Sequence, residues 1–139
     1  MYKVTFYPGF FRGDFEREAS NAALEIMLDC LVRLDVLYLS QYPDTPPLYQ
    51  AGVRYKREGL REENWLAIPH VLKQKHGDCE DLASWRTAEL QRQGIAARPM
   101  FTWAKLPNGG TLYHIKVQHP NGQIEDPSRI LGMKSKVEL

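Results

Sequence analysis

The chain has 139 residues, of which 43% are hydrophobic and 25% are charged, a composition typical of one compact globular domain and not of a disordered or fibrous chain. Its 18 Lys and Arg residues oppose 17 Asp and Glu residues, which leaves a formal charge of +1. This balance gives no overall field that would favour nucleic acid or an anionic membrane. We therefore expect a single domain over residues 1–139 that binds no nucleic acid.

The first half of the chain predicts a strand, a long helix and a loop. Tyr2–Tyr7 alternates as a short edge strand. A helix begins near Asp14, a preferred N-cap residue, and carries apolar residues at helical spacing: Ala19, Ala22, Ala23, Ile26, Met27, Leu31, Leu34 and Tyr38. Cys30 lies within this helix, where we expect a buried apolar side chain without chemistry. Residues 41–64 predict a proline-rich, charged surface loop.

The second half predicts two helices followed by strands. The helices cover residues 65–74, despite Pro69, and residues 79–93, where Gly94 ends the pattern. The period then changes to two, which predicts strands at residues 95–104, 111–118 and 123–126 with glycine-containing turns between them. The expected fold class is α+β, with helices packed on a small antiparallel sheet.

No segment of the sequence predicts a membrane span or a secretion signal. No apolar run approaches the roughly 20 residues that a membrane helix needs, and residues 1–10 lack a charged stretch followed by an apolar core. We expect the product to stay in the cytoplasm.

Cys79 is the main candidate for chemistry, because an expected turn at Gly77 places it in the first turn of a predicted helix. Unpaired N–H groups and the positive end of the helix dipole favour a thiolate there, and cysteines in such positions can have pKa values of roughly 3.5–7.5. The same N–H groups can stabilise an oxyanion formed on an attacked carbonyl. The competing interpretation is a capped helix whose cysteine is inert.

A thiolate needs a proton acceptor, and the four histidines of the chain compete for that role. His70 and His76 lie near Cys79 in sequence, but a Cys/His site requires nearness in space, and we expect His119, which precedes Pro120, at a turn. We favour His114, since a predicted strand holds its side chain in a fixed direction. A structural strand histidine is the alternative.

Asp126 ends the strand that follows His114. A tight turn near Pro120–Gly122 would place the two strands side by side, within reach for a carboxylate to orient the imidazole and to stabilise the imidazolium. The alternative is an ordinary Asp-Pro turn, formed with Pro127.

Three segments together resemble the cysteine, histidine and aspartate motifs of the transglutaminase-like superfamily: Gly77-Asp78-Cys79-Glu80-Asp81-Leu82-Ala83, Tyr113-His114-Ile115-Lys116-Val117 and Ile124-Glu125-Asp126-Pro127-Ser128. The resemblance implies a papain-like α+β core over about residues 65–130, to which residues 1–64 add a strand, a long helix and a loop. It also implies a catalytic triad in which Cys79 is the nucleophile, His114 the base and Asp126 the orienting residue.

The resemblance is closest to bacterial transglutaminase-like cysteine peptidases and to short phage-encoded relatives found among virion genes. The chain is similar to the latter in its brevity and in Pro47–Gln50 and Val53–Glu58. This implies a protein or peptide substrate. For a bacteriophage protein it also implies the host cytoplasm or the virion as location, with head or tail proteins as partners.

Some peptidases of this type bind calcium beside the cysteine, and Asp78, Glu80 and Asp81 offer the hard oxygens that calcium prefers. Without a cation, three carboxylates should raise the pKa of the Cys79 thiol. We favour capping and salt bridges for these acidic residues. No other cofactor is expected, because paired metal-ligand spacings and a phosphate-binding glycine loop are lacking.

Two classes of function stay open. In the first, thiolate attack gives an acyl-enzyme, which water resolves by hydrolysis or deamidation and a lysine amine resolves by crosslinking. Of these outcomes, we favour hydrolysis of a peptide or isopeptide amide. In the second, the chain is a phage virion or assembly protein that keeps the fold and acts as a binding module.

Overall fold

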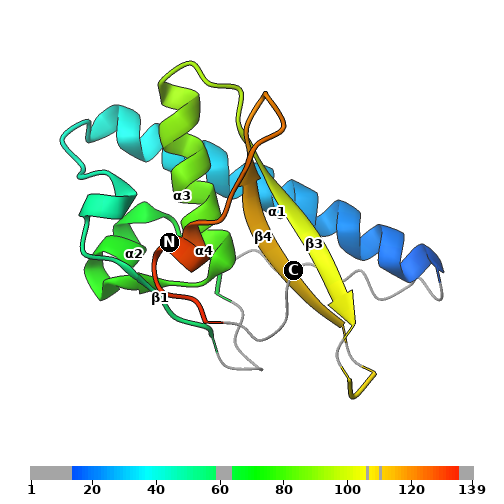
Figure 1. Ribbon diagram of the computed structural model, residues 1–139. Coiled ribbons are helices and arrows are strands. Elements are labelled where there is room, and N and C mark those ends of the chain that lie inside the picture. Colours follow the sequence, from blue (N-terminus) through cyan, green and yellow to red (C-terminus); the bar gives the residue numbers. More distant parts are fainter. Residues whose placement is uncertain (1–13, 59–63, 106, 110, 135–139) are drawn as a thin grey trace.

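The computed structural model describes residues 14–58, 64–105, 107–109 and 111–134, and its elements are arranged as an α+β fold (Figure 1). In chain order they are α1 (Asp14–Gln41), η1 (Leu48–Gln50), β1 (Arg54–Tyr55), α2 (Ile68–Gln74), β2 (His76–Gly77), α3 (Cys79–Arg92), β3 (Arg98–Lys105), β4 (Thr111–Gln118), β5 (Ile124–Glu125) and α4 (Pro127–Ile130). The predicted strand at residues 2–7 lies outside the described residues.

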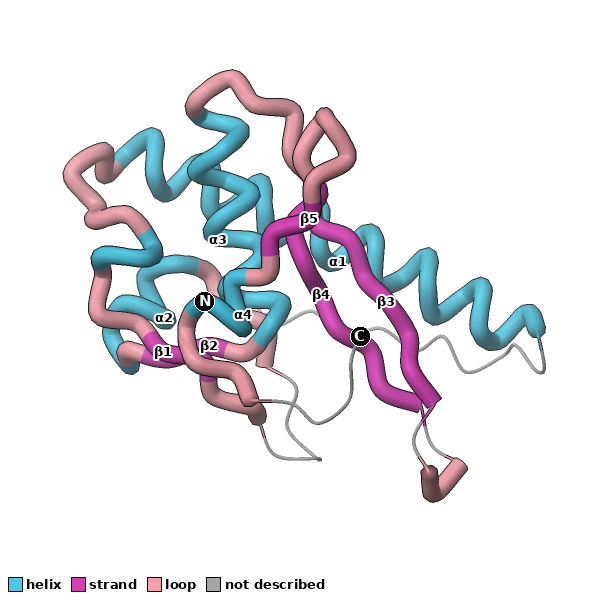
Figure 2. Tube along the Cα trace, viewed as in Figure 1, coloured by secondary structure: helices cyan, strands magenta, loops and turns pink. Residues whose placement is uncertain are grey.

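Two small sheets accompany the helices. Strands β3, β4 and β5 form the expected antiparallel meander, in which β4 pairs with β3 along its whole length and with β5 only at Val117 and Gln118 (Figure 2). Strands β1 and β2 form a separate two-stranded parallel sheet. The α+β expectation and the predicted order of the meander are therefore confirmed.

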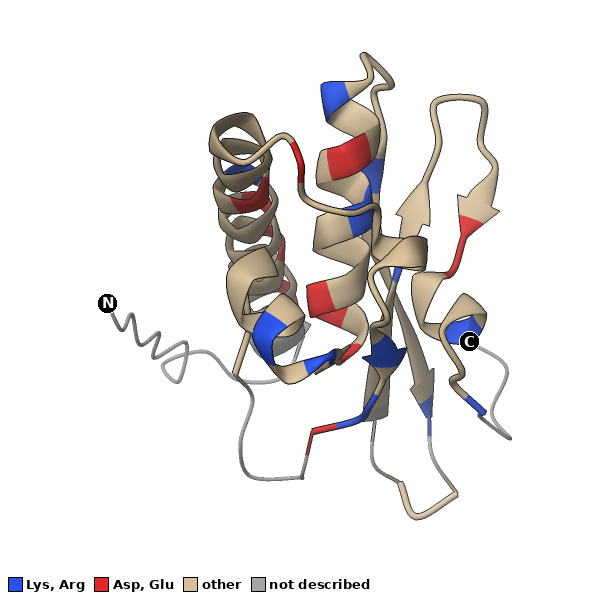
Figure 3. Ribbon diagram, turned by 90° about the vertical axis from the view of Figure 1, so that its left-hand side faces the viewer, with Lys and Arg blue, Asp and Glu red and all other residues tan. Residues whose placement is uncertain are grey.

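Helix α3 is the central element of the fold. It contacts α1 and α2, both long strands of the meander, and α4, and Figure 3 shows α1 and α3 standing side by side. Its buried residues contribute to two hydrophobic clusters, one around Trp85 and Leu82 and one around Ala83 and Ile115. A helix that is buried on nearly all sides has little freedom to shift, so its first turn is held in a fixed place. No helix in the described parts of the chain is both long and apolar enough to cross a membrane.

The buried face of α1 differs from the prediction. Its buried residues are Leu28, Leu31, Val32, Asp35 and Leu39. The predicted face included Ile26 and Leu34, whose exposed fractions are 61% and 49%, and Cys30 is exposed and not buried. The helical period and Leu31 were predicted correctly, but the buried face is shifted from the predicted one, because a polar residue, Asp35, lies within the buried stripe.

Asp35 explains how α2 begins. Its Oδ1 accepts a hydrogen bond of 2.9 Å from the backbone N–H of Ile68, while the N-cap residue of α2, Ala67, supplies no side-chain cap. A side-chain carboxyl group from α1 therefore caps α2. The helix starts at Ile68, later than the predicted residue 65, and Pro69 lies in its first turn, where a missing N–H costs nothing.

The segment at residues 41–58 is not only a surface loop, as predicted. Leu48, Ala51 and Val53 are buried in the cluster around Trp85, and β1 pairs in parallel with β2 so that Tyr55 lies opposite Gly77. A two-residue parallel pairing leaves no periodic pattern in the sequence, which is why the prediction missed it.

Gly77 was expected to form a turn, but it lies in strand β2 and does not have a positive φ. A Cβ at this position would lie 3.1 Å from Asp81 Cβ and 3.2 Å from Leu82 Cδ2. Glycine is therefore required by the close approach of β2 to the first turn of α3, directly before Cys79.

We predict that Gly77→Ala lowers the free energy of unfolding by about 1–3 kcal/mol, because the added methyl group forces β2 away from α3. Urea unfolding followed by circular dichroism measures the loss. Ala22→Ser, at an exposed position of α1, should change stability by less than about 0.5 kcal/mol. Equal stability of the Gly77→Ala variant and the original chain would contradict the close-packing argument.

Candidate active site

His114 and Asp126, the predicted base and orienting residue, lie in contact. The Val117–Glu125 pairing of β4 with β5 brings the end of β5 beside β4, and Asp126 follows as the N-cap of α4. His114 Nε2 lies 2.9 Å from Asp126 Oδ2, with only 3% of the His114 side chain exposed. This contact leaves Nδ1 as the ring nitrogen that can exchange a proton with another group.

Asp126 is held as a carboxylate. Burial by itself would raise its pKa, but the hydrogen bond and charge of His114 bring the pKa below its ordinary value, with help from the Arg129 backbone and the Lys116 charge. Arg129 Nε also lies 3.4 Å from Asp126 Oδ2. An ionised, anchored carboxylate of this kind fixes the orientation of the imidazole ring.

Cys79 is the first residue of α3 and is 6% exposed. Its sulfur interacts with the backbone N–H of Ile115, which is the next residue after His114 on β4. The fold thus brings the nucleophile candidate to the part of β4 that carries the base candidate. Among the described residues, however, no hydrogen bond joins Cys79 Sγ to the His114 ring.

The environment of Cys79 raises the pKa of its thiol well above the ordinary value. Burial is the largest cause, followed by the charges of Glu80 and Asp78, while the Ile115 N–H acts weakly in the other direction. The expectation that the helix N-terminus lowers this pKa is therefore wrong for this site. Cys79 is a neutral thiol at neutral pH in the free protein.

The first turn of α3 explains this outcome, because carboxyl groups already satisfy its N–H groups. Asp78 Oδ1 accepts a hydrogen bond of 2.7 Å from the Cys79 N–H, and Asp78 also accepts from the Asp81 N–H. Asp81 Oδ2 in turn accepts from the Asp78 N–H at 3.1 Å, which completes a capping box. The Glu80 carboxyl accepts from its own N–H. Because these N–H groups are already occupied by carboxyl groups, they are not free to stabilise a thiolate.

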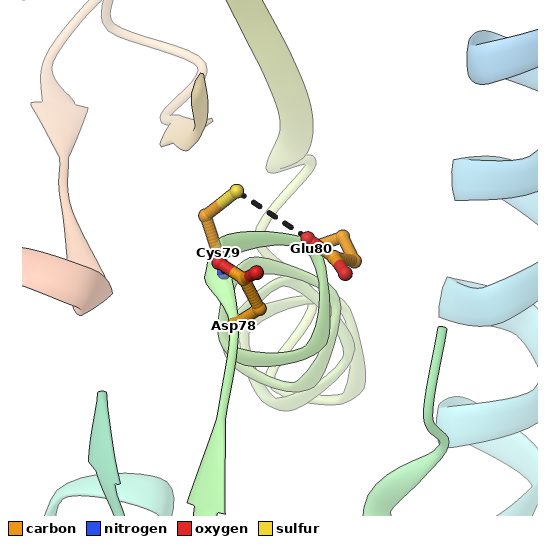
Figure 4. A group of neighbouring side chains, drawn as sticks. All are labelled: Asp78, Cys79 and Glu80. Carbon is orange, nitrogen blue, oxygen red and sulfur yellow. Dashed lines mark hydrogen bonds between the residues drawn. The ribbon is translucent and has the colours of Figure 1, made fainter. Parts of the chain in front are cut away.

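Glu80 lies directly beside the nucleophile candidate. Its side chain is 2% exposed, and its Oε2 lies 3.4 Å from Cys79 Sγ (Figure 4). Burial, followed by the charges of Asp81 and Asp78, raises its pKa to about 9. The residue next to the thiol is therefore a neutral carboxylic acid at neutral pH. Figure 3 shows acidic residues at this end of α3.

The predicted calcium ligands divide into two groups. Asp78 and Glu80 each have a carboxylate oxygen within 4.8 Å of the other and of Cys79 Sγ. Asp81 is turned away, since its Oδ1 accepts from the Leu66 N–H at 2.7 Å and its Oδ2 belongs to the capping box. The structure supports the capping role for Asp78 and Asp81. Two carboxylates and a sulfur fall short of the six to eight oxygens that calcium prefers, and calcium stays an untested prediction.

Tyr55 is a neighbour of the site that the sequence did not reveal. Its ring is half-buried in β1, opposite Gly77. Burial, followed by the nearby charges of Asp78 and Cys79, raises the pKa of its hydroxyl, so Tyr55 is a protonated hydrogen-bond donor at neutral pH. Only the pairing of β1 with β2 brings it to Cys79, and no local pattern could have identified it.

A second group that the sequence did not reveal surrounds Glu125, the neighbour of Asp126. Glu125 Oε2 lies 2.6 Å from Arg86 Nε on α3 and also accepts from the Tyr49 hydroxyl. Its Oε1 lies 3.0 Å from His119 Nε2, and the Arg86 guanidinium stacks 5.3 Å from the Tyr49 ring centre. These contacts join β5 to α3 and η1 and so help to keep Asp126 in place relative to the helix of Cys79.

No family model, no curated protein and no solved structure matches this chain. The resemblance to transglutaminase-like proteins therefore rests on the three sequence motifs and remains a prediction.

We predict that Glu80→Gln stabilises the protein at pH 8 by at least about 1.4 kcal/mol, the equivalent of one pKa unit. The folded-state pKa of Glu80, about 9, exceeds the ordinary value of 4.5. The stability contributed by its neutral form is therefore complete below about pH 4 and is lost as the pH rises toward 9. Urea unfolding at pH 5 and pH 8, with a chelator present, measures the difference, which should be larger at pH 8.

Glu18→Gln, at an exposed position of α1, is the control for Glu80→Gln and should change stability equally little at both pH values. A Glu80→Gln effect that does not vary with pH would show that the carboxyl is ionised in the folded protein, contrary to the raised pKa that its burial predicts.

Proposed function

We propose that the chain is a thiol-dependent amide hydrolase or acyl transferase in which Cys79, His114 and Asp126 act together. The observation that carries this proposal is the buried hydrogen bond of 2.9 Å between His114 Nε2 and Asp126 Oδ2. A carboxylate hydrogen-bonded to one ring nitrogen holds a histidine base in a fixed orientation and leaves the other nitrogen for proton transfer. It orients an imidazole beside the strand position, Ile115, that touches the Cys79 sulfur.

The proposed reaction begins from a neutral thiol. His114 Nδ1 takes the thiol proton as the sulfur attacks the carbonyl carbon, so that a C–S bond forms and the carbonyl oxygen becomes an oxyanion. The imidazolium is stabilised by Asp126 and then gives its proton to the departing amine as the C–N bond breaks. Water attacks the thioester in the second half-reaction and releases the acid. The resemblance to transglutaminase-like peptidases favours water over a lysine amine as the acceptor, and a peptide or isopeptide bond as substrate.

The second candidate is a binding module of a phage particle that keeps the fold without turnover. One observation favours it: the Cys79 thiol is 6% exposed, has a raised pKa and makes no hydrogen bond to His114 among the described residues. Buried cysteines of this kind are inert in many proteins. Acylation of Cys79 separates the two candidates directly.

We predict that 4-nitrophenyl acetate acetylates Cys79 in a Cys30→Ser background, which removes the exposed thiol. His114→Ala should slow the acetylation by about 100-fold or more, the usual contribution of a positioned base, and Asp126→Asn should slow it by at least about tenfold. Release of nitrophenolate gives the rate, and peptide mass spectrometry locates the acetyl group.

His70→Ala is the matched control, since His70 is an exposed histidine of α2, and it should leave the acetylation rate unchanged. Thermal unfolding of each variant confirms that it is folded. A folded protein in which Cys79 is not acetylated, or is acetylated at the same rate without His114, would favour the binding module.

A further inference from the structure

An oxyanion formed at Cys79 needs hydrogen-bond donors, and the first turn of α3 does not offer them freely. The N–H groups of Cys79 and Asp81 both donate to the Asp78 carboxylate, and the Glu80 N–H faces its own carboxyl group. The Ile115 N–H is directed at the sulfur. A carboxylate in this position would also repel a developing negative charge. The stabilising donor must therefore come from another element.

Strand β1 brings such a donor to the site. Its backbone is fixed against the segment that leads into α3: the Lys56 N–H donates to the Gly77 carbonyl at 2.9 Å, and the Tyr55 N–H donates to the Leu131 carbonyl at 3.0 Å. This pairing sets Tyr55 opposite Gly77, two residues before Cys79. The Tyr55 ring packs on the core, while its hydroxyl lies close enough to Asp78, Cys79 and Glu80 to be affected by the charge of each.

The Tyr55 hydroxyl is available to a substrate. It makes no side-chain hydrogen bond to another of the described residues, and its ring is only half-buried. Trp65 is the other donor near this cluster, and its Nε1 has no partner. That nitrogen is enclosed by protein, however, so a carbonyl oxygen arriving from solvent would meet Tyr55 first.

We propose that Tyr55 is a further catalytic residue, whose hydroxyl donates a hydrogen bond to the oxyanion that forms when Cys79 attacks a carbonyl. This inference rests on the proposed function. The phenol keeps its proton throughout: it stabilises the charged oxygen while the C–S bond forms, and it releases that oxygen when the carbonyl re-forms and the leaving group departs. Such a donor matters only for substrates that develop an oxyanion.

Two reactions of the same thiol test this role in the Cys30→Ser background. Acetylation by 4-nitrophenyl acetate passes through an oxyanion, whereas alkylation by iodoacetamide is a direct displacement at carbon and forms none. Tyr55→Phe removes the hydroxyl and keeps the ring that packs on the core. We predict that it slows acetylation of Cys79 by about 100-fold, the usual effect of losing one such donor, and changes the alkylation rate by less than about twofold.

Tyr42→Phe is the matched control, because Tyr42 is an exposed tyrosine that stacks on Tyr38 at the end of α1. It should change neither rate. If Tyr55→Phe leaves acetylation unchanged, or slows acetylation and alkylation equally, the proposed role is overturned, since the hydroxyl then does nothing or acts on the thiol itself. If the parent protein is not acetylated at all, the proposed function fails and this inference fails with it, an outcome that the parent protein alone reveals.

Discussion

The capping box between Asp78 and Asp81 holds the start of α3, and the rest of the site depends on it. The side-chain carboxyl group of each residue accepts a hydrogen bond from the backbone N–H of the other. Each also accepts from a preceding segment: Asp78 from the Glu58 N–H at 3.0 Å and Asp81 from the Leu66 N–H at 2.7 Å. The segments that contain Glu58 and Leu66 are thereby hydrogen-bonded to the first turn of α3. That turn carries Cys79, so the position of the nucleophile candidate follows from the cap.

The same cap creates an electrostatic conflict. Burial of Cys79 is the main obstacle to ionisation of the thiol, and the carboxyl groups of Glu80 and Asp78 at the helix end add to it. In the proposed reaction the conflict is relieved by the His114–Asp126 pair, because the proton leaves the thiol only as the new bond forms. The cysteine of such a site is not ionised before substrate binds, and this limits side reactions with other electrophiles and oxidants.

Much of this arrangement could be predicted from the sequence, where a local pattern or a tight turn determines the outcome. Helix α3 ends at Arg92, one residue before the predicted end and shortly before Gly94, β4 has the predicted bounds, and a short connection brings Asp126 to His114. The errors share a physical cause, namely contacts between distant segments. The phase of α1 depends on a buried Asp35 that caps another helix, and the place of Tyr55 depends on a two-residue parallel pairing. The raised pKa of Cys79 likewise could not be predicted, because it depends on how the surrounding residues pack.

The parallel pairing of β1 with β2 has a consequence for the boundaries of the folding unit. The three motifs begin at Gly77, yet residues 48–55 fill the core beside Trp85 and supply Tyr55 to the site. We therefore expect that residues 65–130 alone do not fold into the complete site. Grafting the motifs onto another scaffold would require this earlier segment to travel with them, and insertions that lengthen the connection between β1 and α2 would be tolerated better than deletions that shorten it.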